Sequence, residues 1–90
     1  MKRVRVFVEG RVQGVVFREH TRRTAAILGV KGFVRNLDDG RVEAVFEGSG
    51  RAVDEAVEWV RTGPPLAVVD HVDVHGEPPT GEYDIFAIFP

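Results

Sequence analysis

Residues 31–47, KGFVRNLDDGRVEAVFE, decide the fold, because they combine two short strands with a tight turn. Residues 31–36 form the first strand, and residues 41–47 alternate apolar and polar side chains as a half-buried strand does. The triplet Asp-Asp-Gly at 38–40 separates them, and this composition is typical of a chain reversal. The stretch therefore predicts a β-hairpin.

A helix is predicted on each side of this hairpin. Residues 18–28 place small and apolar side chains at helical spacing, and Gly29 follows where a helix-ending glycine is expected. Residues 50–62 carry an apolar stripe of the same period. Ser49 is the candidate N-cap of this second helix, and Gly-Pro-Pro at 63–65 ends it.

Three further strands complete the pattern. Residues 3–9 alternate, with valines on one face and mostly polar side chains on the other, which predicts a half-buried strand. Residues 67–75 form another strand, and its apolar phase slips between Val69 and Val72, which predicts a β-bulge. After the polar connection GEPPTGE, residues 83–89 form the last strand.

The predicted order is therefore strand, helix, strand, strand, helix, strand, strand. Amphipathic strands need one covered face, and two amphipathic helices can cover it. We expect an α+β fold, a ferredoxin-like βαββαβ sandwich with an added C-terminal strand and two helices packed on one face of a five-stranded sheet. The length of 90 residues predicts a single domain over residues 1–90.

Composition narrows the classes of function. There is no cysteine, which excludes disulfides, thiolate-ligated zinc, iron–sulfur clusters and a cysteine nucleophile. The start has no apolar run of signal-peptide length and the longest apolar run, 85–89, cannot span a membrane, so we expect a cytoplasmic protein without a membrane partner. The net charge is −2, but residues 1–41 carry +6 and residues 42–90 carry −8. Either the opposite charges of the two halves neutralise each other in the fold, or the basic half contains an anion-binding site.

The segment Gly10 to Arg18, GRVQGVVFR, is the candidate functional loop between the first strand and the first helix. Glycines at 10 and 14 let the backbone adopt positive φ, and successive inward N–H groups form a concave anion site. The helix N-terminus behind them adds unpaired donors and partial positive charge. Arg18 at this position opposes the helix dipole unless a bound anion compensates it. The alternative is a surface arginine in an ordinary strand-to-helix turn.

Asn36 ends the strand before the Asp-Asp-Gly turn. A neutral amide donates and accepts at once, so it can hold a water beside an oxyanion; the alternative is a simple turn residue. The histidines offer no metal site, because His71 and His75 are about 13 Å apart along a strand. His20 follows the loop and either faces solvent or tunes the loop. No pair of carboxylates has the pattern of a general acid and base.

Two long motifs in register resemble the acylphosphatase family. They are V-E-G-R-V-Q-G-V-V-F-R at 8–18 and G-F-V-R-N-L-D-D-G-R-V-E at 32–43. The similarity continues through Leu-Gly at 28–29, GPP-x-A-x-V at 63–69 and F-x-I at 86–88, so it covers essentially the whole chain. The family has the ferredoxin-like sandwich, which agrees with the fold expected from the strand and helix pattern.

The resemblance implies a hydrolase, without metal or cofactor, that splits the carboxyl–phosphate anhydride of acyl phosphates into a carboxylate and inorganic phosphate. The family's essential arginine maps to Arg18 and its essential asparagine to Asn36. Its phosphate-binding loop, which acts through backbone N–H groups, maps to Gly10, Arg11, Val12, Gln13, Gly14, Val15, Val16 and Phe17. Arg18 and the loop are then expected to hold the phosphoryl oxygens. Asn36 would orient the attacking water, with the substrate's own phosphate as the base.

The expected partners are a small acyl phosphate and inorganic phosphate, the latter as product and inhibitor, and the chain is expected to be a monomer. An RNA-binding module on this fold would need stacking aromatic residues on central strands, where the sequence has valines, so no nucleic acid is expected. Two alternatives stay open: a domain that serves a larger carbamoyl-transfer protein, and an enzyme for another phosphorylated metabolite. The ending Phe89-Pro90 departs from the family, where Arg or Tyr often follows F-x-I.

Overall fold

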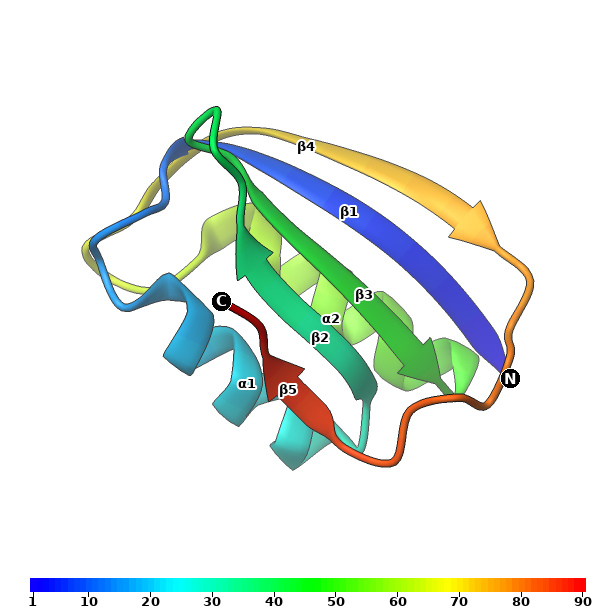
Figure 1. Cartoon of the computed structure of the whole chain (residues 1–90). Helices are drawn as coiled ribbons and strands as arrows, with labels where there is room; N and C mark the ends of the chain where they lie inside the picture. Colours follow the sequence, from blue (N-terminus) through cyan, green and yellow to red (C-terminus); the bar gives the residue numbers. More distant parts are fainter.

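The computed structural model describes residues 1–90 and contains the predicted elements in the predicted order. They are β1 (Lys2–Arg11), α1 (Phe17–Leu28), β2 (Lys31–Asn36), β3 (Val42–Gly48), α2 (Gly50–Thr62), β4 (Val68–Glu77) and β5 (Phe86–Ile88). The strands form one sheet in the order β4-β1-β3-β2-β5 (Figure 1). Neighbouring strands are antiparallel, except that β2 and β5 are parallel. The expected ferredoxin-like sandwich with an added C-terminal strand is confirmed.

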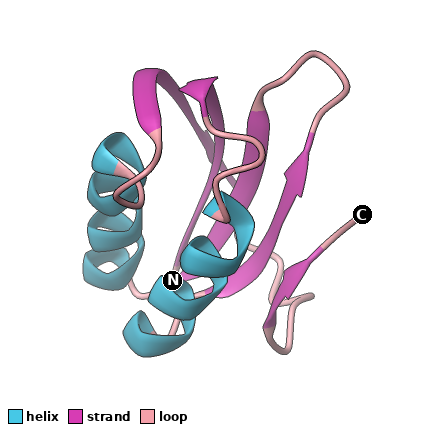
Figure 2. Ribbon diagram, turned by 90° about the vertical axis from the view of Figure 1, so that its left-hand side faces the viewer, coloured by secondary structure: helices cyan, strands magenta, loops and turns pink.

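Both helices cover the same face of the sheet (Figure 2). Alternation in β1 points Val4, Val6 and Val8 to this face, where they are at most 3% exposed. Val53 and Val60 on the apolar stripe of α2 are fully buried in the same core. Burial of each such side chain stabilises the fold by about 1.5 kcal/mol or more, so this core fixes how the helices lie on the sheet.

The predicted end of α1 at Gly29 and the predicted Ser49 cap of α2 are confirmed, whereas α1 begins at Phe17, one residue before the predicted start. Gly29 follows α1 with φ 74°, and its N–H lies against the carbonyls of Ala25 and Ala26. This left-handed conformation suits glycine, which has no Cβ. At the start of α2, the Ser49 side chain accepts a hydrogen bond from the Ala52 N–H at 3.2 Å. That bond satisfies one of the donors that a helix N-terminus leaves unpaired.

The boundary between β1 and the functional loop lies further along the chain than the sequence predicts. Glu9 pairs with His71 and Gly10 with Val69, which leaves an extra residue in β4 and confirms the predicted bulge. A Cβ on Gly10 would lie 2.1 Å from the Val68 carbonyl oxygen, so this glycine allows β4 to approach. β1 continues to Arg11, and the loop therefore begins at Val12 rather than at Gly10. The last strand is also shorter than the expected 83–89, because only Phe86–Ile88 pairs with β2.

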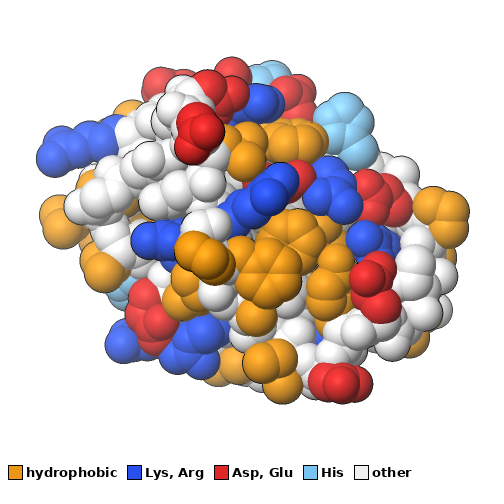
Figure 3. Space-filling model, viewed as in Figure 1, with side chains coloured by type: hydrophobic (Ala, Val, Ile, Leu, Met, Phe, Trp, Pro, Cys, Tyr) orange, Lys and Arg blue, Asp and Glu red, His pale blue; other side chains and the backbone are white.

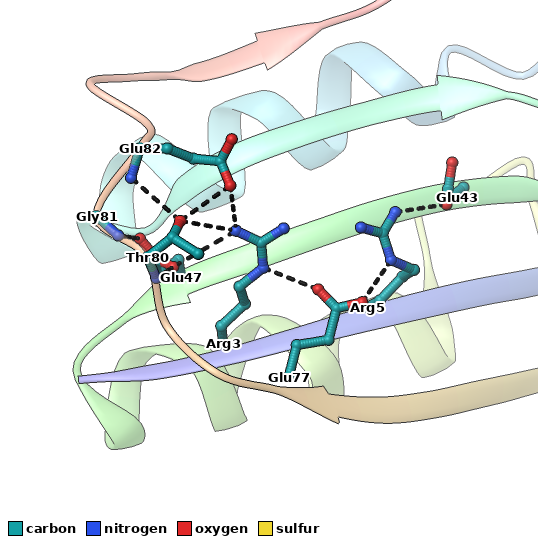
Figure 4. Close-up of polar contacts among 8 residues, drawn as sticks. All are labelled: Arg3, Arg5, Glu43, Glu47, Glu77, Thr80, Gly81 and Glu82. Atoms are coloured by element: carbon teal, nitrogen blue, oxygen red, sulfur yellow. Dashed lines mark hydrogen bonds and ion pairs between the residues drawn. The ribbon is translucent and has the colours of Figure 1, made fainter.

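The second face of the sheet carries a network of ion pairs that the sequence pattern did not reveal (Figure 4). Arg3, expected on the polar face of β1, is only 7% exposed. Its guanidinium donates to Glu77 at 2.8 Å and to Glu82 at 2.7 Å, and Arg5 donates to Glu77 at 2.7 Å. The connection between β4 and β5 passes over this end of the sheet, and its Thr80 hydroxyl accepts from Arg3 at 3.0 Å. Arg3 is therefore buried together with carboxylate and hydroxyl partners that its guanidinium contacts directly.

Candidate active site

An open pocket of about 360 Å³ lies where the β1–α1 loop, the start of α1, the end of β2 and β5 meet. It is lined by Val12, Gly14, Val16, Phe17, Arg18, Glu19, Asn36 and Ile88. Arg18 and Asn36, which the sequence singled out separately, share this pocket because β2 runs beneath the start of α1. In Figure 1 the C-terminus lies beside the same region, near the blue loop.

The backbone N–H groups of the loop are not used within the protein. None of residues 12–16 donates its backbone N–H to another backbone or side-chain acceptor. The first helical bond of α1 runs from the His20 N–H to the Val16 carbonyl at 3.1 Å, and no side chain caps this end. The backbone N–H groups of residues 17–19, in the first turn of α1, therefore also have no partner within the helix. Free N–H groups at a helix N-terminus attract anions, so these groups are available for the anion site that the sequence predicts.

The loop backbone contains two left-handed residues that shape this donor array. Gly14 has φ 73° and Val16 has φ 54°, and Val16 is the only residue other than glycine with positive φ. For an L-residue this conformation costs about 1–2 kcal/mol, and strain of this kind concentrates at functional sites. Left-handed residues within a loop turn successive N–H groups toward one side, which forms a concave anion site. Val12 and Val15, 1% and 6% exposed, attach the loop to the core.

Arg18 projects from the first turn of α1 and touches the C-terminal tail. Its Nη1 donates to the Phe89 carbonyl at 3.3 Å, on the exposed side of the pocket. Phe89 is itself fixed, because its N–H donates to the Val34 carbonyl at 2.9 Å and its ring stacks on Phe33 at 4.7 Å. A guanidinium has five N–H donors, so this contact orients Arg18 and leaves donors for an anion. The sequence marked the Phe89-Pro90 ending as unusual but did not indicate this contact.

Asn36 is the last residue of β2 and pairs with Val42 of β3. Its Oδ1 is the one buried side-chain nitrogen or oxygen atom in the chain without a hydrogen-bond partner. Buried polar atoms almost always have a partner, so this exception needs a cause. Asn36 also lines the pocket, and its amide has both an acceptor oxygen and a donor nitrogen.

Glu19 lines the pocket beside Arg18, a position that the sequence did not predict. Its carboxylate accepts from Arg22 at 2.5 Å and from Arg23 at 3.2 Å. The hydrogen bond from Arg22, with that from Arg23, holds the pKa of Glu19 below its usual value. Glu19 is thus paired with two arginines that do not line the pocket. Ile88, the other unpredicted lining residue, lies on β5 far along the chain, and no local signal links it to the loop.

The remaining residues of the predicted loop have different surroundings. Gly10 and Arg11 pair with β4 and lie outside the pocket lining. Val15 is in the core cluster. The Gln13 side chain reaches across to the β2–β3 turn, where its Nε2 donates to the Leu37 carbonyl at 2.8 Å and to the Arg41 carbonyl at 2.9 Å. The sequence assigned Gln13 only a backbone role, so this side-chain contact was missed.

The structure contains no group of three or more His, Cys, Asp or Glu side chains that could hold a metal ion. His71 instead bonds Asp73 at 2.8 Å, and the His75 ring meets Phe7 edge-on at 5.9 Å. No helix combines the length and the apolar character needed to cross a bilayer.

Comparison with known proteins gives one consistent family. The model of the acylphosphatase family matches residues 4–88. An acylphosphatase from Rubrobacter xylanophilus is 64% identical over 80 residues, which are 89% of this chain and 73% of that protein. An acylphosphatase from Syntrophus aciditrophicus is 56% identical over 88 residues, which are 98% of this chain and 92% of that protein.

Solved structures agree with the sequence comparison. The crystal structure of an acylphosphatase from Bacillus subtilis matches with a TM-score of 0.96 and 37% identity, over 100% of both chains. The T. kodakarensis HypF structure matches with a TM-score of 0.86 and 33% identity, over 100% of this chain but 12% of that one. The same fold thus occurs both in chains of this size and as a small part of a much larger protein.

Proposed function

This chain belongs to the acylphosphatase family, and from that premise we propose how its own residues carry out the reaction. The enzyme hydrolyses small acyl phosphates. In our proposal the free N–H groups of the loop from Val12 and the Arg18 guanidinium bind the phosphoryl oxygens. Asn36 orients the water that attacks phosphorus. The reaction then depends on positioning and on charge stabilisation, which are the main demands of phosphoryl transfer.

The proposed step is a direct displacement. The water oxygen forms a bond to phosphorus while the bond between phosphorus and the acyl oxygen breaks. The carboxylate leaves with that electron pair, and the water proton passes to an oxygen of the transferred phosphate. No protein base is required, which fits a pocket whose one carboxylate, Glu19, is already paired with Arg22 and Arg23.

The observation that carries this proposal is that Asn36, whose amide oxygen has no hydrogen-bond partner within the protein, lines the same pocket as Arg18 and part of the loop. The oxyanions of a phosphate accept hydrogen bonds and cannot satisfy another acceptor. A water molecule can, because it donates one proton to Asn36 and presents its lone pair to phosphorus. Asn36 therefore fits the role of water ligand better than that of phosphate ligand.

Arg18→Lys tests the phosphate-binding side of the proposal. Lysine keeps the charge but replaces a planar fork of donors with a single point, so we expect loss of most activity. The measurement is hydrolysis of benzoyl phosphate with EDTA present, which also tests the expected independence from metal. Arg23→Lys on the same helix is the matched control, because Arg23 is 63% exposed and outside the pocket lining. Wild-type turnover by Arg18→Lys would contradict the proposal.

Asn36→Ala tests the water-binding side. Loss of a single positioning group of this kind lowers kcat by roughly 10²–10³-fold, and we expect a loss in this range. The affinity for inorganic phosphate, measured as its inhibition constant, should change much less. Equal losses in kcat and phosphate affinity would instead make Asn36 a phosphate ligand.

Two finer points belong to the same proposal. Inorganic phosphate offers the same oxyanions as the substrate, so we expect it to inhibit competitively, which steady-state kinetics at several phosphate concentrations would test. We also expect a monomer over residues 1–90 to be active, which sedimentation together with an activity assay would test. A cytoplasmic location and the absence of a nucleic-acid partner stay predictions.

A further inference from the structure

We propose that Gln13 is a positioning residue, whose side-chain amide sets the distance between the phosphate-binding loop and the water held by Asn36. This inference rests on the proposed function, because it gives Gln13 an effect only through the Asn36 water. The Gln13 amide is not among the groups that line the pocket, so it is not expected to touch the substrate.

The Gln13 side chain is the only polar link between the loop and the hairpin that carries Asn36. Residues 12–16 make three hydrogen bonds to the rest of the protein. One is the helical bond that the Val16 carbonyl accepts from His20, and the other two are donated by Gln13. The loop is otherwise attached through the buried side chains of Val12 and Val15. Apolar contacts are non-directional, so they hold the loop near the core without fixing its register against β2.

The two acceptors of Gln13 are the ends of the turn that follows Asn36: Leu37 comes directly after Asn36, and Arg41 is at the far end of the turn. The Leu37 N–H donates to the Arg41 carbonyl at 2.8 Å, and the Gly40 N–H donates to the Leu37 carbonyl at 3.2 Å, which closes the β2–β3 turn. Each carbonyl has two lone pairs, so the two amide protons of Gln13 use the acceptor sites that the turn leaves over. One side chain therefore holds both ends of the turn against the loop, and Asn36 is the neighbouring residue.

This link matters because the two halves of the reaction are held by different parts of the chain. The loop would hold phosphorus and β2 would hold the water, and displacement needs the two reacting atoms about 3–3.5 Å apart. A misplacement of about 1 Å can cost roughly 100-fold in rate. The donors of the loop have no protein partners that would restrain them, and two of its residues are in the left-handed conformation. The two hydrogen bonds from Gln13 therefore restrain the position of the loop relative to β2.

Gln13→Met tests the inference, because methionine has a similar length and no donor. The turn keeps its own hydrogen bonds, so the fold should remain. We expect kcat for benzoyl phosphate to fall about 10–100-fold while the inhibition constant of inorganic phosphate changes by less than about 3-fold. Ser49→Ala is the matched control for general destabilisation, because it removes the N-cap bond of α2 away from the pocket and should leave kcat unchanged.

A double-mutant cycle with Asn36→Ala separates this inference from the proposed function. If Gln13 acts through the Asn36 water, its removal has little further effect once Asn36 is gone, and the double variant should be about as slow as Asn36→Ala alone. If the two losses multiply, Gln13 acts independently and the inference is wrong while the function of Asn36 stands. If Asn36→Ala alone keeps wild-type kcat, the proposed function fails and this inference fails with it.

Two other results would also overturn the inference. One is an unchanged kcat in Gln13→Met. The other is a loss of phosphate affinity equal to the loss of kcat, which would mean that Gln13 only forms the loop. Should Gln13→Met not fold, Gln13→Glu has the same shape, and its carboxylate donates nothing until it is protonated. Its kcat relative to wild type should then recover as the pH falls toward about 4.3, and no recovery would count against the inference.

Discussion

Gly14 shows at the scale of one residue why the loop needs its particular sequence. Its φ is 73°, and a Cβ there would meet no atom within 4 Å. A larger side chain would therefore fit in the available space, and glycine is required because of the backbone conformation. The same holds for Gly40 in the β2–β3 turn, which has φ 95° and open space around it. The two glycines carry the same backbone requirement, but only Gly14 lines the pocket.

We expect Gly14→Ala and Gly40→Ala to cost similar stability and to differ in function. Each forces an alanine into the left-handed region, which lowers the free energy of unfolding by about 1 kcal/mol. Urea denaturation measures that loss. Only Gly14→Ala should raise the inhibition constant of inorganic phosphate, because relaxation of its φ turns loop N–H groups away from the anion. An equal effect of both variants on phosphate affinity would show that the loss is not specific to the loop.

At the scale of an element, β2 connects β3, β5 and the pocket. It pairs with β3 on one side and with β5 on the other, and its last residue, Asn36, lines the pocket. Gly32 makes this position possible, because a Cβ on it would lie 1.9 Å from the Val45 carbonyl oxygen and its φ is 139°. The close approach of the β3 backbone therefore depends on a missing side chain, and the place of Asn36 depends on that approach.

Gly32→Ala should consequently be among the most damaging single changes in the sheet. A backbone oxygen cannot move aside as a flexible side chain can, so overpacking adds to the cost of positive φ, and we expect a loss of about 2–4 kcal/mol. Thermal unfolding is the measurement. Gly48→Ala at the end of β3 is the control, because the nearest atom to its Cβ is 3.6 Å away, an ordinary contact. If the two variants unfold at the same temperature, the close approach of β2 and β3 does not limit stability.

At the scale of the whole molecule, charged and hydrophobic side chains share the face of the sheet that the helices leave uncovered (Figure 3). Arg5 lies over the Phe33 ring at 5.9 Å and Arg3 over the Tyr83 ring at 5.3 Å. Phe33 is only 7% exposed, so this aromatic residue is packed within the protein rather than presented to a base. The basic N-terminal half and the acidic C-terminal half meet here, in pairs such as Arg3 with Glu77.

The free energy of unfolding should decrease as the pH is lowered, because the carboxylates of this ion-pair network become protonated. The hydrogen bond from Arg5, with that from Arg3, holds the pKa of Glu77 below its ordinary 4.5, and the hydrogen bond from Arg3 does the same for Glu82. The unfolded chain therefore takes up protons at a higher pH than the folded chain. The stabilisation is complete above about pH 4.5 and is lost as the pH falls through the lower folded-state pKa values.

Urea denaturation from about pH 7 to about pH 3 measures this effect. Glu82→Gln keeps the shape of the side chain and removes its titration, so the pH dependence should become shallower. Glu58→Gln, a variant of a carboxylate 82% exposed on α2, should keep the wild-type slope. An unchanged slope in Glu82→Gln would show that the network does not govern acid sensitivity.

The sequence alone determined the features that depend on near neighbours. The order of the elements, the Gly29 and Ser49 helix caps and the bulge in β4 follow from local periodicity and backbone chemistry, which a few adjacent residues fix. The two long motifs likewise indicated the family, which the comparisons confirm. The choice of Arg18 and Asn36 as catalytic residues came from the same motifs and awaits the variants proposed above.

Only the tertiary structure decided which residues meet. Strand register brings Asn36 under the start of α1, and the return of β5 brings the Phe89 carbonyl to Arg18. The burial of Arg3 and the reach of Gln13 to the β2–β3 turn depend on partners at least 24 residues away in the sequence. A local sequence pattern indicates which face of a strand or helix a side chain occupies, but not which residues it contacts there. Those contacts are determined when the strands pair and the helices pack, because both act between segments that are distant in the chain.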